Sequence, residues 1–331
     1  MQEKSNTEER KMSKLKVGPL QEGLTFGARI SGINKQNAED AAIRAEVIEI
    51  FERDGVIVFE GVEQTDEMQV ALSNIFGPLK EHPVASLTRV NADAMPGVIQ
   101  IRQRPNSGNV VELAGKRLAN WLPWHFDHCY NNELNRAGIL RAVEIVAEGG
   151  RTGFADGIEL YKALSPELLA QIEGKEILYT LDTQYDAMRF GVPRDFTVIE
   201  RKAMAPGFEE AARAMPRAIH PAVWKRATGE KVLHISPWMS VGIVGEETPE
   251  GDALLEAVCQ EINLLAATRS YHHQWQPTDM VIWDNWRVLH SVSGHDPSLG
   301  RTMYRTTIKG DYGLGHFEND AKGGKILEMM V

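Results

Sequence analysis

The chain has 331 residues, 43% of them hydrophobic, and a formal net charge of −10. This length predicts about two domains at roughly 150 residues each, although single β-rich domains often run longer. The acidic balance argues against a nucleic-acid partner, because binding a phosphate backbone needs clustered basic side chains and none are visible along the chain. No stretch approaches the roughly 18 apolar residues of a membrane-spanning helix, so we expect no membrane association.

The two cysteines, Cys129 and Cys259, cannot form a disulfide framework. The charged N-terminal stretch lacks the apolar segment of a signal peptide. Together these features predict a cytoplasmic protein.

Residues 1–14 alternate charges without apolar periodicity and are predicted to be a disordered leader. No internal repeat or long Pro/Gly linker marks a boundary in the remaining chain. We therefore predict one domain over residues 15–331.

Apolar residues at helical spacing predict a first helix over residues 38–55 and a second that begins at Thr65 or Asp66 and ends near Gly77. Later helices are predicted over 157–174 and 251–270. Short β-branched runs predict strands over residues 55–61, 97–102, 137–146, 231–236, 279–285 and 301–312.

Many short strands with a few inserted helices predict a mainly β protein with a double-sheet jelly-roll barrel and helices packed outside it. A parallel α/β sheet is the competing layout. The Gly-rich stretch "GGRTGFADG" (149–157) has neither the GxGxxG spacing nor the Lys-Ser/Thr pair of a phosphate-binding turn, which disfavours that layout.

The stretch "WHFDHCY" (124–130) concentrates side chains that coordinate metals. In an extended strand, residues two apart point to the same face, so His125 and Asp127 would converge on one ion. Cys129 would share that face, but we expect a small buried hydrophobic side chain there. The alternative for the pair is a histidine at a strand end that is hydrogen-bonded to a nearby aspartate.

A second cluster supplies a third candidate ligand, His290, after an apolar strand. Two histidines and one carboxylate leave coordination positions free, as in non-haem Fe(II) oxygenases. A structural zinc site would fill all four of its positions, preferably with cysteine.

Arg301 and Arg305 lie four residues apart and would share one face of a regular strand. Inside a barrel, two guanidinium groups are costly unless anions meet them, and arginine binds carboxylates through paired hydrogen bonds. The alternative is a pair of surface arginines on an edge strand.

These segments resemble the TauD/TfdA family of Fe(II)- and 2-oxoglutarate-dependent dioxygenases. The resemblance extends from about Leu15 and is carried, in the order of the family, by "FGARISGI", "DGVIVFEG", "IFGPLKEHPV", "WHFD", "GGRTGFAD", "GEKVLHIS", "WQPTDMVIWDN", "RVLH" and "GRTMYRTTIKGD". It implies a double-stranded β-helix of cupin type and a reaction in which 2-oxoglutarate and O₂ become succinate and CO₂ while a C–H bond is oxidised, most simply by hydroxylation.

The resemblance also implies roles for seven residues. It places iron on His125, Asp127 and His290, the far carboxylate of 2-oxoglutarate on Thr152 and Arg301, and an anionic group of the primary substrate on Arg305 and His82. The implied partner is a small molecule, a carboxylate or a sulfonate. Relatives commonly form oligomers, so a homo-oligomer is expected.

Three positions depart from taurine dioxygenase: Ala85 stands where that enzyme has Tyr, Trp121 where it has Asn, and Met239 where it has an aromatic residue. A bulkier or more apolar acid than taurine is therefore expected. Two rival functions remain open, a zinc hydrolase on a related barrel and a non-catalytic barrel that binds a small acid.

Overall fold

The computed structural model describes residues 15–80, 89–91, 95–201 and 207–320. The predicted disordered leader over residues 1–14 lies outside the described residues, as do His82 and Ala85. The assignment of residues 15–331 to a single domain stays a prediction.

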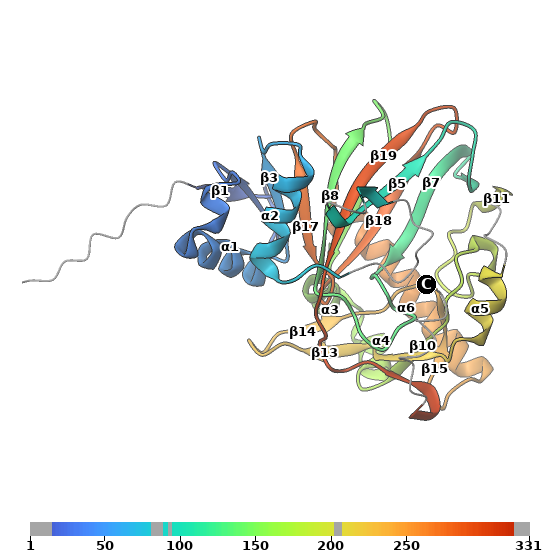
Figure 1. The fold of residues 1–331 in the computed structure, drawn as a ribbon. Coiled ribbons are helices and arrows are strands. Elements are labelled where there is room, and N and C mark those ends of the chain that lie inside the picture. The colour runs from blue at the N-terminus through green and yellow to red at the C-terminus, as the bar shows by residue number, and fades with distance from the viewer. Residues whose placement is uncertain (1–14, 81–88, 92–94, 202–206, 321–331) are drawn as a thin grey trace, which may run out of the picture.

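Two β-sheets form the centre of the protein (Figure 1). The larger sheet has eight strands in the spatial order β1 Lys16–Pro19, β2 Ala28–Ser31, β3 Val56–Glu60, β17 Met280–Asp284, β8 Ala137–Glu144, β19 Arg301–Ile308, β5 Met95–Gln103 and β4 Arg89–Asn91. The smaller sheet has six, in the order β11 Phe196–Glu200, β6 Val110–Leu113, β7 Lys116–His125, β18 Val288–His295, β9 Thr152–Asp156 and β16 Tyr271–His273.

The two sheets pack face to face through a shared apolar layer. Val281, Trp283 and Met303 of the larger sheet form one buried cluster with Phe154 and Val288 of the smaller one. Neighbouring strands are antiparallel in both sheets, apart from the parallel pair β2 and β3. The predicted jelly-roll core is therefore confirmed, and the competing parallel α/β layout is wrong.

The helices are α1 Ala41–Asp54, α2 Asp66–Phe76, α3 Gly157–Ala163, α4 Pro166–Ile172, α5 Phe208–Ala214 and α6 Pro249–Arg269. Short 3₁₀ turns occupy Asn37–Glu39, Tyr185–Ala187 and Glu318–Asp320.

Helices α1 and α2 cover the outer face of the larger sheet, at the left in Figure 1. Helix α1 begins after Asp40, whose side chain accepts two backbone N–H groups, and it ends at Gly55 with a left-handed φ of 74°. Helix α2 begins after Thr65, whose hydroxyl accepts the N–H of Met68 at 3.2 Å. Both predicted helices are confirmed: Gly55 ends the first and Thr65 caps the second, as predicted.

The helical segment predicted over 157–174 folds as two helices, α3 and α4. Pro166 is the first residue of α4. Proline has no N–H to donate to the preceding turn, so a single helix through this point is excluded. Helix α6 matches its predicted range closely, and its residues Leu255 and Val258 pack in the same buried cluster as Phe126 and Leu289. Phe126 directly follows His125 and Leu289 directly precedes His290, so this cluster anchors the chain next to both histidines.

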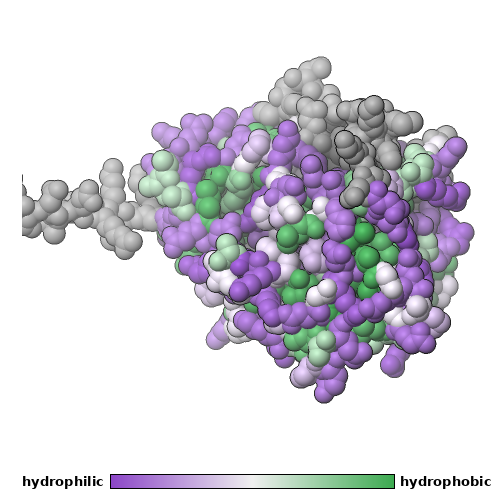
Figure 2. Space-filling view, turned by 90° about the horizontal axis from the view of Figure 1, so that it is seen from below, coloured by the Kyte–Doolittle hydropathy of each residue, from purple (hydrophilic) through white to green (hydrophobic). Residues whose placement is uncertain are grey.

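The remaining strands form a four-stranded sheet and a hairpin. The sheet has the order β15 Ser240–Ile243, β10 Glu176–Tyr179, β12 Ala218–Pro221 and β20 His316–Phe317, and the hairpin pairs β13 Val223–Lys225 with β14 Lys231–Leu233. Seen from below, the surface is largely hydrophilic with separate hydrophobic patches (Figure 2). No helix among the described residues has the length and apolar character needed to cross a membrane.

Candidate metal centre

Two histidines face each other across neighbouring strands of the smaller sheet. His125 is the last residue of β7, and His290, in β18, pairs directly with it. The pairing register shifts at a bulge just after His290. The two imidazole rings lie with their centroids 4.1 Å apart. The antiparallel register alone thus brings these two predicted ligands together.

Asp127 lies in a turn, two residues beyond the end of β7. The prediction that one extended strand directs the side chains of both His125 and Asp127 toward the ion is therefore wrong. Asn285 holds the turn instead: its Oδ1 accepts the backbone N–H of Asp127 at 2.8 Å, and its Nδ2 donates to the backbone carbonyl of Asp127 at 3.1 Å. Asn285 is fully buried, so these two bonds fix the Asp127 backbone in the interior.

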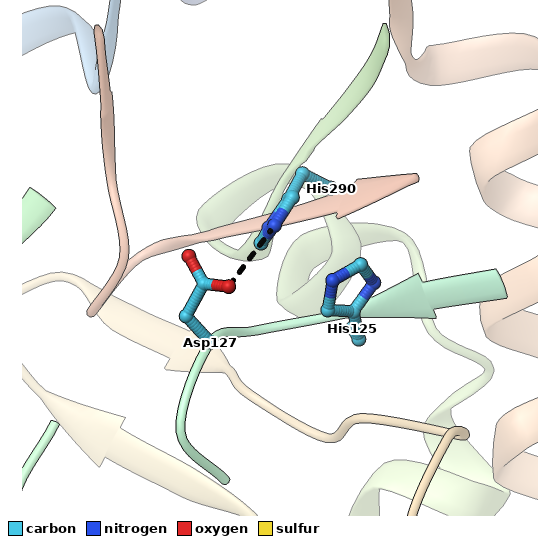
Figure 3. Close-up of side chains that lie close together, drawn as sticks. All are labelled: His125, Asp127 and His290. Carbon is cyan, nitrogen blue, oxygen red and sulfur yellow. Dashed lines mark ion pairs between the residues drawn. The ribbon is translucent and has the colours of Figure 1, made fainter. Parts of the chain in front are cut away.

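The three predicted ligands converge on a common point (Figure 3). One ligand atom from each of His125, Asp127 and His290 lies within 4.8 Å of the others. The Nε2 of His290 is 3.6 Å from Oδ1 of Asp127. Two imidazoles and one carboxylate at this spacing match the three-residue set of a non-haem iron site.

His125 is a neutral imidazole. Burial, reinforced by the nearby His290, lowers the pKa of His125 to about 3. Its Nδ1 lies 2.8 Å from the carbonyl oxygen of Pro123, an acceptor that requires the proton on Nδ1. The lone pair is therefore on Nε2, the form in which histidine ligates metals.

Arg305 pairs with the carboxylate of Asp127. The Nη1–Oδ1 distance is 3.1 Å and the Nη2–Oδ2 distance is 2.5 Å. Burial alone would raise the pKa of Asp127, but the Arg305 charge, followed by His290, holds that pKa well below its usual range. Asp127 is thus an ionised carboxylate, as a metal ligand must be.

Arg301 is a buried cation that forms no ion pair with any residue that the structure describes. It is 5% exposed, and its Nη2 has no hydrogen-bond partner in the described part of the chain. Burial lowers the pKa of Arg301 to about 10, which leaves the guanidinium charged at neutral pH. It lines a small pocket with Gly150, Trp275 and Glu144, whose carboxylate accepts the hydroxyl of Thr302 at 2.9 Å. A buried charge without a partner is costly, so the guanidinium of Arg301 is suited to pair with an anion.

Thr152 reaches the same region from β9. It is fully buried, and its hydroxyl accepts the indole N–H of Trp275 at 3.1 Å. Trp275 in turn lines the Arg301 pocket. Thr152 pairs with Val292, two residues past His290, so β9 links the pocket to the candidate metal ligands.

Sequence reasoning missed one aromatic residue at the site. Trp238, in the turn after β14, stands edge-on to His125 with ring centroids 5.2 Å apart. The ring centroids of Trp238 and Tyr185 lie 5.9 Å apart, and those of Tyr185 and Trp121 lie 5.6 Å apart. No motif marks Trp238, although it directly precedes Met239, a position where a pocket residue was expected.

Cys129 does not join the site. It is 2% exposed, and its Sγ lies 3.8 Å from the sulfur of Met239. Burial raises the pKa of this thiol to about 12. The expectation of a small buried hydrophobic side chain is confirmed.

The model of the taurine catabolism dioxygenase TauD, TfdA family matches residues 16–307. The chain belongs to this family. As a TauD/TfdA protein it is an oxidoreductase, and its cofactor set is Fe(II), 2-oxoglutarate and O₂, as predicted.

Curated relatives of this TauD/TfdA protein span nearly its whole length. The (S)-phenoxypropionate/alpha-ketoglutarate-dioxygenase of Sphingobium herbicidovorans is 28% identical over 305 residues, which cover 89% of this chain and 95% of the relative. The alpha-ketoglutarate-dependent 2,4-dichlorophenoxyacetate dioxygenase of Cupriavidus pinatubonensis is 28% identical over 309 residues, 86% of this chain and 95% of the relative. Pentalenolactone F synthase of Streptomyces arenae is 25% identical over 297 residues, 87% and 93% of the two chains.

Solved structures support the fold. A taurine dioxygenase from Burkholderia xenovorans superposes with a TM-score of 0.67 at 24% identity, covering 96% of this chain and 100% of that one. AAD-2, crystallised with Mn(II) and N-oxalylglycine, gives a TM-score of 0.66 at 22% identity and covers 90% and 98% of the two chains.

Proposed function

We propose that this TauD/TfdA dioxygenase oxidises, by hydroxylation, a C–H bond of a small anionic organic substrate. The reaction consumes 2-oxoglutarate and O₂ and releases succinate and CO₂. The observation that carries the proposal is the open set of His125, Asp127 and His290, together with Arg301, a buried cation that has no ion-pair partner among the described residues.

Fe(II) fits the donors of the candidate centre. A neutral imidazole at His125 and an ionised carboxylate at Asp127 are the protonation states that a divalent metal needs. We assign the iron to these two residues and His290. Bound iron supplies the activation of O₂, and the three protein ligands leave coordination positions for the cosubstrate and O₂.

We assign the far carboxylate of 2-oxoglutarate to Arg301 and Thr152. The carboxylate would give the buried guanidinium its missing partner through paired hydrogen bonds. The Thr152 hydroxyl already accepts a hydrogen bond from the indole N–H of Trp275, so its own O–H can donate to the same anion. A zinc hydrolase would not explain the buried Arg301 or the position of Thr152.

We assign an anionic group of the primary substrate to Arg305, with His82 as its expected partner. The relatives named above act on phenoxypropionate and 2,4-dichlorophenoxyacetate, which are small acids. Arg305 keeps donors free after pairing with Asp127, so a carboxylate or sulfonate can be bound beside the metal.

The deciding experiment has two stages. Anaerobic Fe(II) and 2-oxoglutarate are added to the purified protein, and the weak visible charge-transfer band of such complexes is recorded. Candidate acids are then screened in air for succinate formation that depends on the added acid. A protein that forms no band and releases no succinate with any acid would be a binding protein or a hydrolase instead.

We also propose that the protein is a cytoplasmic homo-oligomer. Light scattering on the purified protein measures the mass of the assembly, and fractionation of the source cells measures its location.

A further inference from the structure

Trp238 carries a buried hydrogen-bond donor. Its Nε1 is buried and finds no acceptor among the described residues. An indole nitrogen can only donate, so this N–H can be satisfied only by a molecule that brings an acceptor to it. Buried donors are rarely left unpaired, and such a group beside a candidate metal ligand points to a ligand contact.

Two hydrogen bonds to backbone carbonyls restrain the turn that carries Trp238. The hydroxyl of Ser236 donates to the backbone carbonyl of Trp238 at 2.5 Å, and that of Ser240 donates to the carbonyl of Pro237 at 3.1 Å. The next residue, Met239, has a φ of 69°. A left-handed conformation is unfavourable for a side chain of this size and persists only where the surroundings fix it. The backbone that carries the indole is therefore held in one conformation.

The position of Trp238 separates it from the cosubstrate pocket. Its ring stands at 88° to the ring of His125, and its other neighbour is Tyr185. The residues that line the pocket around Arg301 include the indole of Trp275 but not Trp238. The indole of Trp238 thus lies beside His125 and is not among the residues that line the pocket of Arg301.

The surroundings of Trp238 are apolar. Tyr185 and Trp121 belong to one hydrophobic cluster, against which Trp238 packs. The Tyr185 hydroxyl is already used, because it donates to the carbonyl of Trp121 at 2.6 Å. The indole N–H of Trp238 is thus a buried donor of this aromatic wall that has no partner among the described residues.

We propose that Trp238 determines substrate specificity by donating its indole N–H to an oxygen of the primary substrate. The substrate class is a small acid whose apolar ring or branched chain carries an ether or carbonyl oxygen, with the apolar part lying against the wall of Trp121, Tyr185 and Trp238. This inference rests on the proposed function and names a feature of the same substrate.

The test compares two probes that differ in one acceptor. They are 2,4-dichlorophenoxyacetate and 3-(2,4-dichlorophenyl)propanoate, in which a methylene replaces the ether oxygen. Each is titrated anaerobically into the Fe(II) and 2-oxoglutarate complex, and the shift of the visible band gives its dissociation constant. We expect wild type to bind the ether about tenfold more tightly, and Trp238→Phe to bind the two probes about equally.

The matched control is Trp224→Phe. The indole N–H of Trp224 already donates to the carbonyl of Trp286 at 2.8 Å. We expect this control to lower the melting temperature and to keep the preference for the ether. Trp238→Phe should leave the melting temperature of the ligand-free protein nearly unchanged, since no bond is lost there.

Three results would overturn the role of Trp238: wild type that binds neither probe, wild type that binds both equally, or a Trp238→Phe variant that keeps the preference. Failure of the proposed function is distinguishable, because the visible band would then be missing before any probe is added.

Discussion

The guanidinium of Arg305 and the carboxylate of Asp127 form two contacts, at 3.1 Å and 2.5 Å, at the group we assign as a metal ligand. Arginine has five N–H donors, and this pair uses two. The Nε of Arg305 is buried without a partner in the described part of the chain. When a divalent ion shares the Asp127 carboxylate, the charge of Arg305 is only partly compensated. An anionic substrate would complete the compensation.

Replacing Arg305 with Met should remove the preference for anions. Wild type is expected to turn over an acid with a kcat/KM at least about thirtyfold above that of its primary amide, since an unpaired buried charge commonly costs about 2–5 kcal/mol. The variant should discriminate far less. The measurement is steady-state succinate formation with both compounds. Equal turnover of acid and amide by wild type would mean that Asp127 alone neutralises Arg305 and that the substrate is uncharged.

Replacing Asp127 with Ala should abolish the visible band of the anaerobic Fe(II) and 2-oxoglutarate complex, because two imidazoles bind iron weakly without the carboxylate. A matched control is Asp186→Ala, which removes an exposed carboxylate paired with Arg201. We expect the control to keep the band. An unchanged band in Asp127→Ala would remove this residue from the ligand set.

Replacing Arg301 with Gln should weaken 2-oxoglutarate binding by more than about tenfold while iron binding stays nearly intact. Titration calorimetry with 2-oxoglutarate measures the effect. The Arg301→Lys variant keeps the charge but cannot form the paired hydrogen bonds to a carboxylate. Its affinity for 2-oxoglutarate should therefore lie between those of wild type and Arg301→Gln.

Stability provides a second measurement on Arg301. The ligand-free Arg301→Gln protein should unfold at the same temperature as wild type or higher, because the uncompensated buried charge is gone. Its melting temperature should no longer rise when 2-oxoglutarate is added with the metal. A dissociation constant equal to that of wild type would show that the cosubstrate is held elsewhere.

Local sequence signals predicted most of the fold because the chain obeys them. Gly55 ends one helix and Thr65 begins the next, where the capping rules place them. The predicted helix over 157–174 failed at Pro166, a residue whose missing N–H should have divided it. The sheet order could not be read from the sequence, because pairing partners such as His125 and His290 lie far apart in the chain.

Residue types predicted the candidate ligands, but contacts between distant segments determine how they are held. Asp127 converges on the histidines through Asn285, which lies 158 residues away. Its pairing with Arg305 depends on the register of β19 in the other sheet. The free donor of Trp238 depends on the absence of an acceptor among the described residues around it, a property that no local pattern encodes.

Replacing Asn285 with Ala should weaken metal binding and destabilise the fold together. The change leaves the backbone N–H and carbonyl of Asp127 without partners in the interior, at about 1–3 kcal/mol for each group. Cobalt titration and urea unfolding measure the two effects. The control is Asn131→Ala, since the Asn131 side chain is buried nearby but accepts only the N–H of Asn132. Cobalt affinity equal to that of wild type in Asn285→Ala would refute its positioning role.

The protein should lose stability in mild acid because two buried histidines are neutral. Burial, reinforced by the nearby His220, lowers the pKa of His234 to about 3, and burial lowers that of His220 to about 4. His234 stacks on Phe126 with ring centroids 3.9 Å apart, and its Nε2 donates to the backbone carbonyl of Asn285 at 3.0 Å. In its neutral form His234 therefore supports Phe126 and Asn285, which adjoin the turn that carries Asp127.

The sign follows from where each histidine takes up its proton. In the unfolded chain a histidine binds a proton below about pH 6.5, whereas the folded protein resists it until pH 3 to 4. As the pH falls through this window the unfolded state binds more protons, so the free energy of unfolding drops by up to about 1.4 kcal/mol per pH unit for each histidine. Urea unfolding of wild type and His234→Gln between pH 6.5 and 5, above most carboxylate titrations, measures the slope. Glutamine does not titrate and keeps a donor for Asn285, so the variant should show a shallower slope; equal slopes would mean that His234 is protonated in the folded protein.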